Sequence, residues 1–209
     1  MTHSYLRRAA LSYFIAGMGF LAFGFPFWFL NAVDKTPKGK FTPPFFFVVD
    51  DPMAALANNW IQLVSAIGLA VGAYSLWQAG EPTGFGKKRA MLFVQMAGGI
   101  SYVLAIWILL PFAPLGAFLN GLGMILVGYT SLKASVWTDW KRYVPLIVGL
   151  FPFVFMFPLR FLTGARPAAV IGLWGFAWLL LGLAAWQRAQ EVKTATGQSA
   201  YDAGFISTL

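Results

Sequence analysis

The sequence predicts an all-helical integral membrane protein with six transmembrane helices arranged as three tandem hairpins. Of its 209 residues, 59% are hydrophobic and 11% are charged, which leaves too little polar surface for a water-soluble domain of this size. Because the bilayer core offers the backbone no hydrogen-bond partners, apolar runs of about 20 residues are stable there as helices. The expected spans are residues 9–31, 55–79, 89–110, 115–136, 143–160 and 167–187.

The first span starts directly after Arg7 and Arg8, an arrangement that also precedes the apolar part of a secretory signal peptide. In a signal peptide that part has about 7 to 15 residues. Here the apolar run continues from Ala9 to Ala32 with a single proline. This length favours retention over cleavage, and we expect the first helix to remain in the protein.

The loop over residues 32–54 is the largest segment expected outside the membrane. Asp51 and Pro52 near its end are typical of a helix start, because aspartate caps free amides and proline suits the first turn. The aromatic residues of the loop favour an interfacial anchor, since aromatic belts lie at membrane surfaces. The alternative is a lid or a docking site for another subunit. The aromatic residues concerned are Phe41, Phe45, Phe46 and Phe47.

The second, fourth and sixth spans share a pattern of small residues. In each span a small residue recurs seven positions later, which is close to two helical turns, so both lie on one face. Small residues let helix backbones approach closely, which drives helix association in lipid. We expect Gly72, Gly128 and Gly182 to occupy similar places in a compact, pseudo-threefold bundle, although apolar helices also resemble one another by composition. The expected packing residues are Ser65, Gly68, Gly72, Gly121, Gly128, Gly175 and Gly182.

The first, third and fifth spans share an early glycine and a proline toward the outer end. Proline there ends or kinks a helix, and the fifth span is the least regular because Pro145 and Pro152 interrupt it as well. Each of these spans would form a hairpin with its successor, and such repetition is typical of repeat architectures. The pairs are Gly17 with Pro26, Gly99 with Pro111 and Gly149 with Pro158, in hairpins over residues 9–79, 89–136 and 143–187.

The glycine-rich hairpins, their prolines and the Leu-Val-Gly-Tyr sequence at Leu126 to Tyr129 resemble the HdeD-like acid-resistance membrane proteins, small six-span bacterial proteins of three hairpins. The resemblance covers most of residues 9–187. It implies a role in acid or stress tolerance at the membrane and supplies no catalytic residue. The sequence departs from that family in its long first outer loop and its aromatic content.

The net charge of +8 is spread over alternate loops, which argues against nucleic acid as a partner. Ten Lys and Arg fall on one side of a six-span path and five on the other. The positive-inside rule then predicts both termini in the cytoplasm of a bacterial inner membrane, with residues 188–209 as a cytoplasmic tail that is flexible or only locally ordered. The richer side holds Arg7, Arg8, Lys87, Lys88, Arg89, Lys133, Lys141, Arg142, Arg188 and Lys193; the other holds Lys35, Lys38, Lys40, Arg160 and Arg166.

Chemically reactive groups are scarce in the expected spans. A charged side chain at a helix centre costs about 2.5 to 3.5 kcal/mol, and Lys133 and Arg160 lie at span ends, where they reach the headgroups. His3 is the only histidine and the chain has no cysteine. Without a nucleophile beside a base and an orienting carboxylate, the sequence predicts neither an enzyme nor a metal site.

Uncharged polar residues in the spans have two interpretations. Amides and hydroxyls commonly tie neighbouring helices together, each contributing about 0.6 to 2 kcal/mol. Alternatively, four of them converge on a narrow path for a small neutral solute. These four are Asn59, Gln62, Gln95 and Asn120.

Nine tryptophans and twenty-one phenylalanines exceed what two aromatic belts need. Flat rings also bind lipids, quinones, carotenoids and other subunits, although no cofactor is predicted. We therefore expect one six-helix domain over residues 1–187 that acts without catalysis, as an accessory subunit of a membrane complex or in envelope stress tolerance. The main alternative is a channel or facilitator for a small neutral solute, and the third is a site for a lipophilic cofactor. Expected partners are membrane lipids and other membrane subunits or copies of the chain itself.

Overall fold

A computed structural model describes residues 2–29, 59–107, 112–163 and 167–206, and this part of the chain is helical without strands. The expected outer loop lies outside these residues, and with it Phe41, Phe45, Phe46 and Phe47. The α-helices are α1 (Thr2–Phe29), α3 (Asn59–Ala79), α4 (Leu92–Trp107), α5 (Phe112–Ala134), α6 (Val144–Phe151), α7 (Phe157–Thr163) and α8 (Pro167–Ile206). Short 3-10 helices, η2 (Glu81–Thr83), η3 (Gly86–Met91) and η4 (Asp139–Tyr143), lie in the connections, and a π-helical turn, Pro152–Met156, joins α6 to α7.

Five helical segments are long and apolar enough to cross a membrane, which confirms the predicted membrane character of the fold. The remaining expected span, residues 89–110, corresponds to α4, whose 16 residues are preceded directly by η3. The five segments are Thr2–Phe25, Ile61–Ala79, Phe112–Ala134, Asp139–Leu159 and Val170–Thr196.

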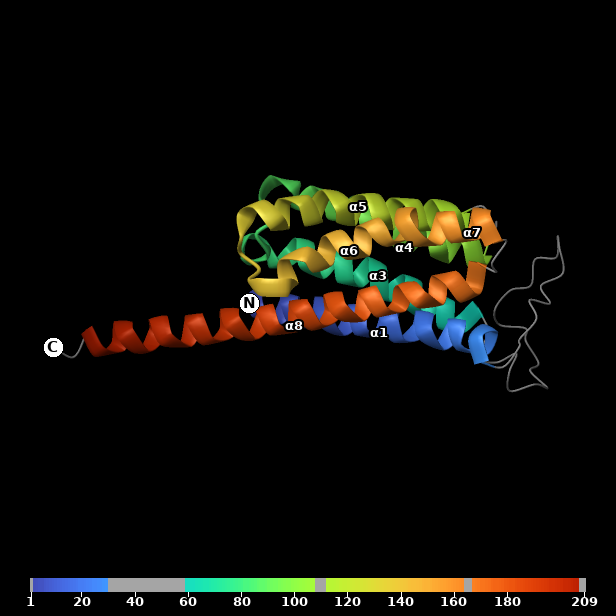
Figure 1. Cartoon of the computed structure of the whole chain (residues 1–209). Coiled ribbons are helices and arrows are strands. Elements are labelled where there is room, and N and C mark those ends of the chain that lie inside the picture. Colours follow the sequence, from blue (N-terminus) through green and yellow to red (C-terminus); the bar gives the residue numbers. More distant parts are fainter. Residues whose placement is uncertain (1, 30–58, 108–111, 164–166, 207–209) are drawn as a thin grey trace.

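The helices pack side by side (Figure 1), and the contacts between them form a closed ring. Going along the chain, α1 contacts α3, α3 contacts α4, α4 contacts α5, α5 contacts α6, and α6 contacts α8. The most extensive contact in the bundle then joins α8 back to α1, whereas the contact between α6 and α8 is the smallest of the six. The last helix is therefore held mainly by the first helix, rather than by its neighbour in the expected third hairpin.

Glycines on α1, α4 and α6 make the same contact with the preceding helix of the ring. A Cβ atom built on Gly17 would lie 2.7 Å from the carbonyl oxygen of Gly175. On Gly99 it would lie 3.0 Å from the carbonyl oxygen of Ala66, and on Gly149 2.8 Å from that of Gly121. In each case a second backbone atom also lies close, the amide nitrogen four residues further on: that of Leu179, Ala70 and Ile125, respectively. Three helix–helix contacts of the ring, α8 with α1, α3 with α4 and α5 with α6, therefore share one register; we call such a contact a seam.

This register corrects the predicted equivalence of Gly72 with Gly128 and Gly182. Gly128 packs on Leu146 and Gly182 on the Ala10 carbonyl, so both face the following helix of the ring. Gly72 instead faces the ring of Tyr13 on the preceding helix, 2.7 Å from a Cβ placed there. In α3 two small residues, Ser65 and Ala66, are adjacent. The residue that occupies the place of Gly175 and Gly121 in the shared contact is Ala66, not Ser65.

Pro152 widens the helix of the fifth span and frees a carbonyl. Pro152 has no N–H to donate to the Val148 carbonyl, its helical partner. The backbone continues as a π turn in which Phe157 N–H donates to the Pro152 carbonyl, and Trp174 Nε1–H of α8 donates to the freed Val148 carbonyl at 3.0 Å. The indole therefore satisfies a backbone group that proline left open and joins α6 to α8.

Replacing Trp174 by phenylalanine is expected to leave the Val148 carbonyl without a donor, in addition to the small cavity that any change from tryptophan to phenylalanine creates in the core. A buried carbonyl in that state costs about 1 to 3 kcal/mol, so the melting temperature in detergent should fall by several degrees. Trp178→Phe is the matched control, because the buried Nε1 of Trp178 has no hydrogen-bond partner among the described residues. Equal losses in both variants would contradict this role for Trp174.

The segment after the sixth expected span also differs from expectation. The tail over residues 188–209 was expected to be flexible or only locally ordered, but α8 continues as a helix to Ile206. Its residues 187–196 include Ala, Gln, Glu, Arg and Lys, which favour helices, and contain no proline. Figure 1 shows α8 continuing well past the end of the bundle.

Candidate functional site

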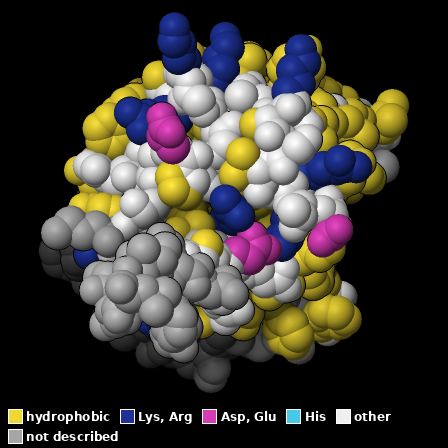
Figure 2. All heavy atoms as spheres, turned by 90° about the vertical axis from the view of Figure 1, so that its left-hand side faces the viewer, with side chains coloured by type: hydrophobic (Ala, Val, Ile, Leu, Met, Phe, Trp, Pro, Cys, Tyr) yellow, Lys and Arg dark blue, Asp and Glu magenta, His cyan; other side chains and the backbone are white. Residues whose placement is uncertain are grey.

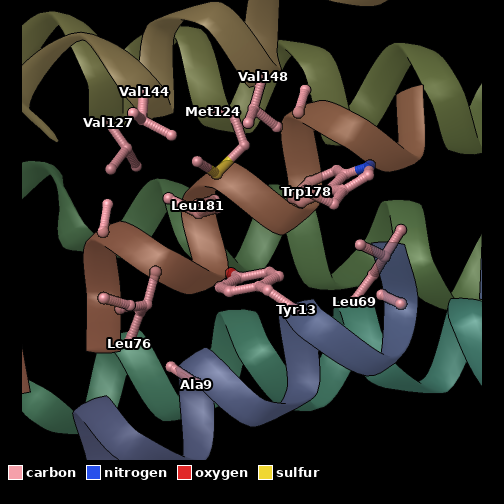
Figure 3. Packing of buried hydrophobic residues seen from close by; sticks show 14 of the residues in the cluster. Ala9, Tyr13, Leu69, Leu76, Met124, Val127, Val144, Val148, Trp178 and Leu181 are labelled. Atoms are coloured by element: carbon pink, nitrogen blue, oxygen red, sulfur yellow. The ribbon is translucent and has the colours of Figure 1, made fainter. Parts of the chain in front are cut away.

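The interior of the ring is filled by large aromatic side chains. Tyr13 stacks on Trp178 at 5.4 Å between ring centroids, and Trp178 contacts Trp174 at 5.1 Å. Trp174 stacks on Phe20 at 6.4 Å, and Phe20 meets Tyr102 edge to face at 6.1 Å. All five side chains are completely buried. Figure 3 shows Tyr13 and Trp178 pointing into the same interior as Leu69, Met124 and Leu181.

One hydrogen-bonded pair crosses this interior. The Tyr13 hydroxyl donates to Gln95 Oε1 at 3.2 Å, and Gln95 Nε2 donates to the Tyr13 hydroxyl oxygen at 3.0 Å. Both residues are fully buried. Since α1 and α4 are not neighbours in the ring, the pair joins two helices across the interior. The sequence singled out Gln95 but not Tyr13, although Tyr13 lies at helical spacing from the buried Ala9, Ala16 and Phe20.

Several other buried polar groups have no partner among the described residues. Asn120 Nδ2 donates to the Gly116 carbonyl of its own helix at 2.8 Å, while its Oδ1 is unpaired. The Tyr102 hydroxyl and Trp178 Nε1 are likewise buried and unpaired. Groups of this kind are usually satisfied by ordered water. They are neutral donors and acceptors and supply no charged general acid or base.

The structure describes three of the four side chains expected to form a polar path. Gln95 and Asn120 are both buried on adjoining helices, where a Cβ on Gly98 would lie 2.5 Å from Asn120 Nδ2. Gln62 is buried near the start of α3, and Asn59 opens that helix, its side chain lying outside the described set. No hydrogen bond joins any two of Gln62, Gln95 and Asn120. The geometry shows a helix-to-helix tie at Gln95 and does not show four converging amides.

All seven expected packing residues lie close to another helix. Cβ atoms on Gly68 and Gly72 would meet α1, those on Gly121 and Gly128 would meet α6 or the adjoining π turn, and those on Gly175 and Gly182 would meet α1. The Ser65 hydroxyl donates to the Ile61 carbonyl at 2.9 Å and lies against Gly19.

An ionic cluster fastens α8 to two loops at one end of the bundle. Glu191 binds Lys141 of η4 through Oε1 and Arg188 through Oε2, the latter at 2.8 Å. Arg188 Nε–H also donates to the Pro82 carbonyl in η2 at 3.1 Å. The Lys141 side chain is only 8% exposed. The sequence did not predict this cluster; only the three-residue spacing of Arg188 and Glu191 would have indicated part of it.

The same end carries most of the charge of the described residues, and we call it the basic end. It contains the start of α1, the loops around η2, η3 and η4, and the continuation of α8 (Figure 1). Figure 2 looks onto this end and shows Lys and Arg side chains spread over the face, with fewer acidic ones between them. The Lys and Arg that the sequence assigned to the richer side therefore gather at one end.

An apolar groove of about 560 Å³ lies on the outside of the bundle between α1 and α3. It is open, and its walls are almost wholly apolar. The described residues contain no group of three His, Cys, Asp or Glu that could hold a metal ion. The groove is lined by Phe14, Ile15, Met18, Gly19, Ala22, Ile61 and Val64.

The chain was compared with protein-family models, with curated proteins and with solved structures, and none of the three comparisons found a match.

Proposed function

We propose that the protein is a non-enzymatic structural or accessory subunit of a membrane complex. The observation that supports this most is the pairing of a filled interior with a projecting helix. Five fully buried rings occupy the centre of the bundle, whereas α8 continues past the bundle to Ile206 (Figure 1). A filled bundle suits a scaffold better than a conduit, and a helix that leaves the bundle is available to another subunit.

We further propose that the basic end lies in the cytoplasm of a bacterial inner membrane, following the positive-inside rule. Both termini would then be cytoplasmic. The common register at Gly17, Gly99 and Gly149 supports a triplicated unit of two helices. The resemblance to HdeD-like proteins, together with this repeat, adds envelope stress tolerance as the process that such a subunit would serve.

Purification from native membranes in mild detergent tests the accessory role. The full chain is compared with a chain that stops after Thr196, which removes the end of α8 and leaves the Glu191 cluster in place. We expect other membrane subunits to be recovered in stoichiometric amounts with the full chain and to be lost from the shortened one. A clean monomer or homo-oligomer from the full chain would contradict the proposal.

A channel for a small neutral solute is the second candidate. It is favoured by the buried, unpaired oxygens of Asn120 and Tyr102, which would hydrogen-bond a solute or water. Liposome flux would be measured for the parent, for Asn120→Leu and for Gln95→Leu. Flux in the parent that falls in both variants would support a channel, whereas no flux in the parent would exclude one.

A lipophilic ligand is the third candidate, and the apolar groove between α1 and α3 supports it. A carotenoid held there would give the purified protein visible absorption bands, which tryptophan and tyrosine lack. A spectrum with protein absorption alone would exclude a carotenoid, and a quinone, whose ultraviolet band overlaps that of the protein, would be identified by solvent extraction.

A further inference from the structure

Four cations at the basic end are each held over an aromatic ring. Arg7 lies 5.0 Å from the ring of Trp186, and Arg8 lies 5.9 Å from that of Tyr5. Lys133 lies 4.5 Å from the ring of Tyr129, and Arg142 lies 4.7 Å from that of Tyr143. We call these four cations and their rings the basic rim. They come from α1, α5, η4 and α8, so the rim is spread over several helices of the ring.

The rings set the depth of the rim. Tyr5 is near the start of α1, Tyr129 is in the last turns of α5, Tyr143 precedes α6, and Trp186 ends the long apolar run of α8. Tyrosine and tryptophan at the ends of membrane spans lie at the level of the lipid headgroups. A cation over such a ring is therefore held beside the phosphates instead of extending freely into water.

The cations of the rim have no carboxylate partners within the described residues. Ion pairs there involve Lys141 and Arg188, which share the single carboxylate of Glu191. Arg7, Arg8 and Lys133 are exposed. Arg142 donates through Nη2 to the Tyr143 hydroxyl at 2.6 Å, while its buried Nε lacks a hydrogen-bond partner in the same part of the chain. The rim thus offers fixed positive charge to an anion from outside the protein.

We propose that the basic rim binds the phosphate groups of anionic phospholipids. Charge complementarity selects an anion, and the position of the rim at the ends of apolar helices selects one that lies in the membrane surface. A guanidinium backed by a ring presents its donors edge-on and in a fixed orientation, which suits the oxygens of a phosphodiester. This binding depends on membrane insertion and is independent of the accessory role.

Native mass spectrometry of the purified full chain tests the proposal. The protein is mixed with phosphatidylglycerol or with zwitterionic phosphatidylcholine at equal concentration, and the lipids retained per protein are counted. We expect phosphatidylglycerol to be retained at least about fivefold better. Equal retention of the two lipids would overturn the proposal.

Removing equal numbers of charges inside and outside the basic rim distinguishes lipid binding at the rim from a general attraction of the basic end for anionic lipid. The pairs R7Q/R8Q and K133Q/R142Q each remove two rim charges, whereas K87Q/K88Q removes two exposed charges of η3 that lie over no ring in the described structure. Each rim pair is expected to lower phosphatidylglycerol retention at least about threefold, and the η3 pair less than about 1.5-fold. Equal losses in all three would overturn the proposal. The two rim pairs are independent, so one of them decides the test if the other does not fold.

Discussion

Leucine in place of Gly175 is expected to prevent α8 from closing the ring. A Cβ at this position would lie 2.6 Å from the Gly17 carbonyl oxygen and 3.0 Å from the Leu21 amide nitrogen, both backbone atoms of α1. Backbone cannot move aside as a flexible side chain can, so the two helices must separate. Overpacking by one or two methyl groups costs about 1 to 3 kcal/mol, and four added carbons at a backbone contact should cost more. Thermal unfolding of purified protein in detergent measures the effect.

Two further variants calibrate that result. Gly175→Ala adds only the Cβ atom and should give an intermediate loss of about 1 to 3 kcal/mol. Ala195→Leu adds bulk at an exposed position of the same helix and should change the melting temperature by little. If the Gly175→Leu and Ala195→Leu variants have the same melting temperature, close packing of α1 against α8 does not determine the stability of the fold.

Alanine in place of Glu191 is expected to release the loops at the basic end. The change leaves the buried Lys141 ammonium without its carboxylate and removes one of the two anchors of Arg188. Breaking a buried ion pair costs about 3 to 5 kcal/mol. Because the Glu191 side chain is 36% exposed, water offsets part of the loss, and we expect about 2 kcal/mol. Unfolding and hydrogen exchange of residues 80–91 and 135–143 would both report it.

A double variant without either charge distinguishes the effect of an unpaired Lys141 ammonium from a loss of packing. Lys141→Met combined with Glu191→Ala removes both charges and should recover much of the stability lost in Glu191→Ala alone. Gln190→Ala, an exposed neighbour on α8, is the control and should be near neutral. A double variant less stable than Glu191→Ala would show that the pair acts through packing rather than charge.

The membrane class and the helix-packing glycines were predictable because both depend on local composition. Long apolar runs specify helices in lipid, and glycine at a helix face specifies close approach. The register of α3 was not predictable, because Ser65 and Ala66 are both small and either can face a neighbour. Only the carbonyl contact of Ala66 with Gly99 decides between them.

Long-range pairs account for the rest of what the sequence did not reveal. Tyr13 and Gln95 are 82 positions apart and Lys141 and Glu191 are 50 apart, and no local pattern links either pair. The helical continuation of α8 was hidden for another reason. A polar segment resembles a flexible tail in the sequence when the residues that hold it in place, here Lys141 and Pro82, lie in distant loops.

The seam between α1 and α8 has a consequence for biosynthesis. Membrane proteins emerge from the ribosome N-terminus first, at about 5 to 20 residues per second. The glycine face of α1 enters the bilayer at the beginning, and the helix that covers it arrives last. For something on the order of ten seconds, that face must rest against lipid or an insertion chaperone, so the nascent bundle stays open until translation of α8 is complete.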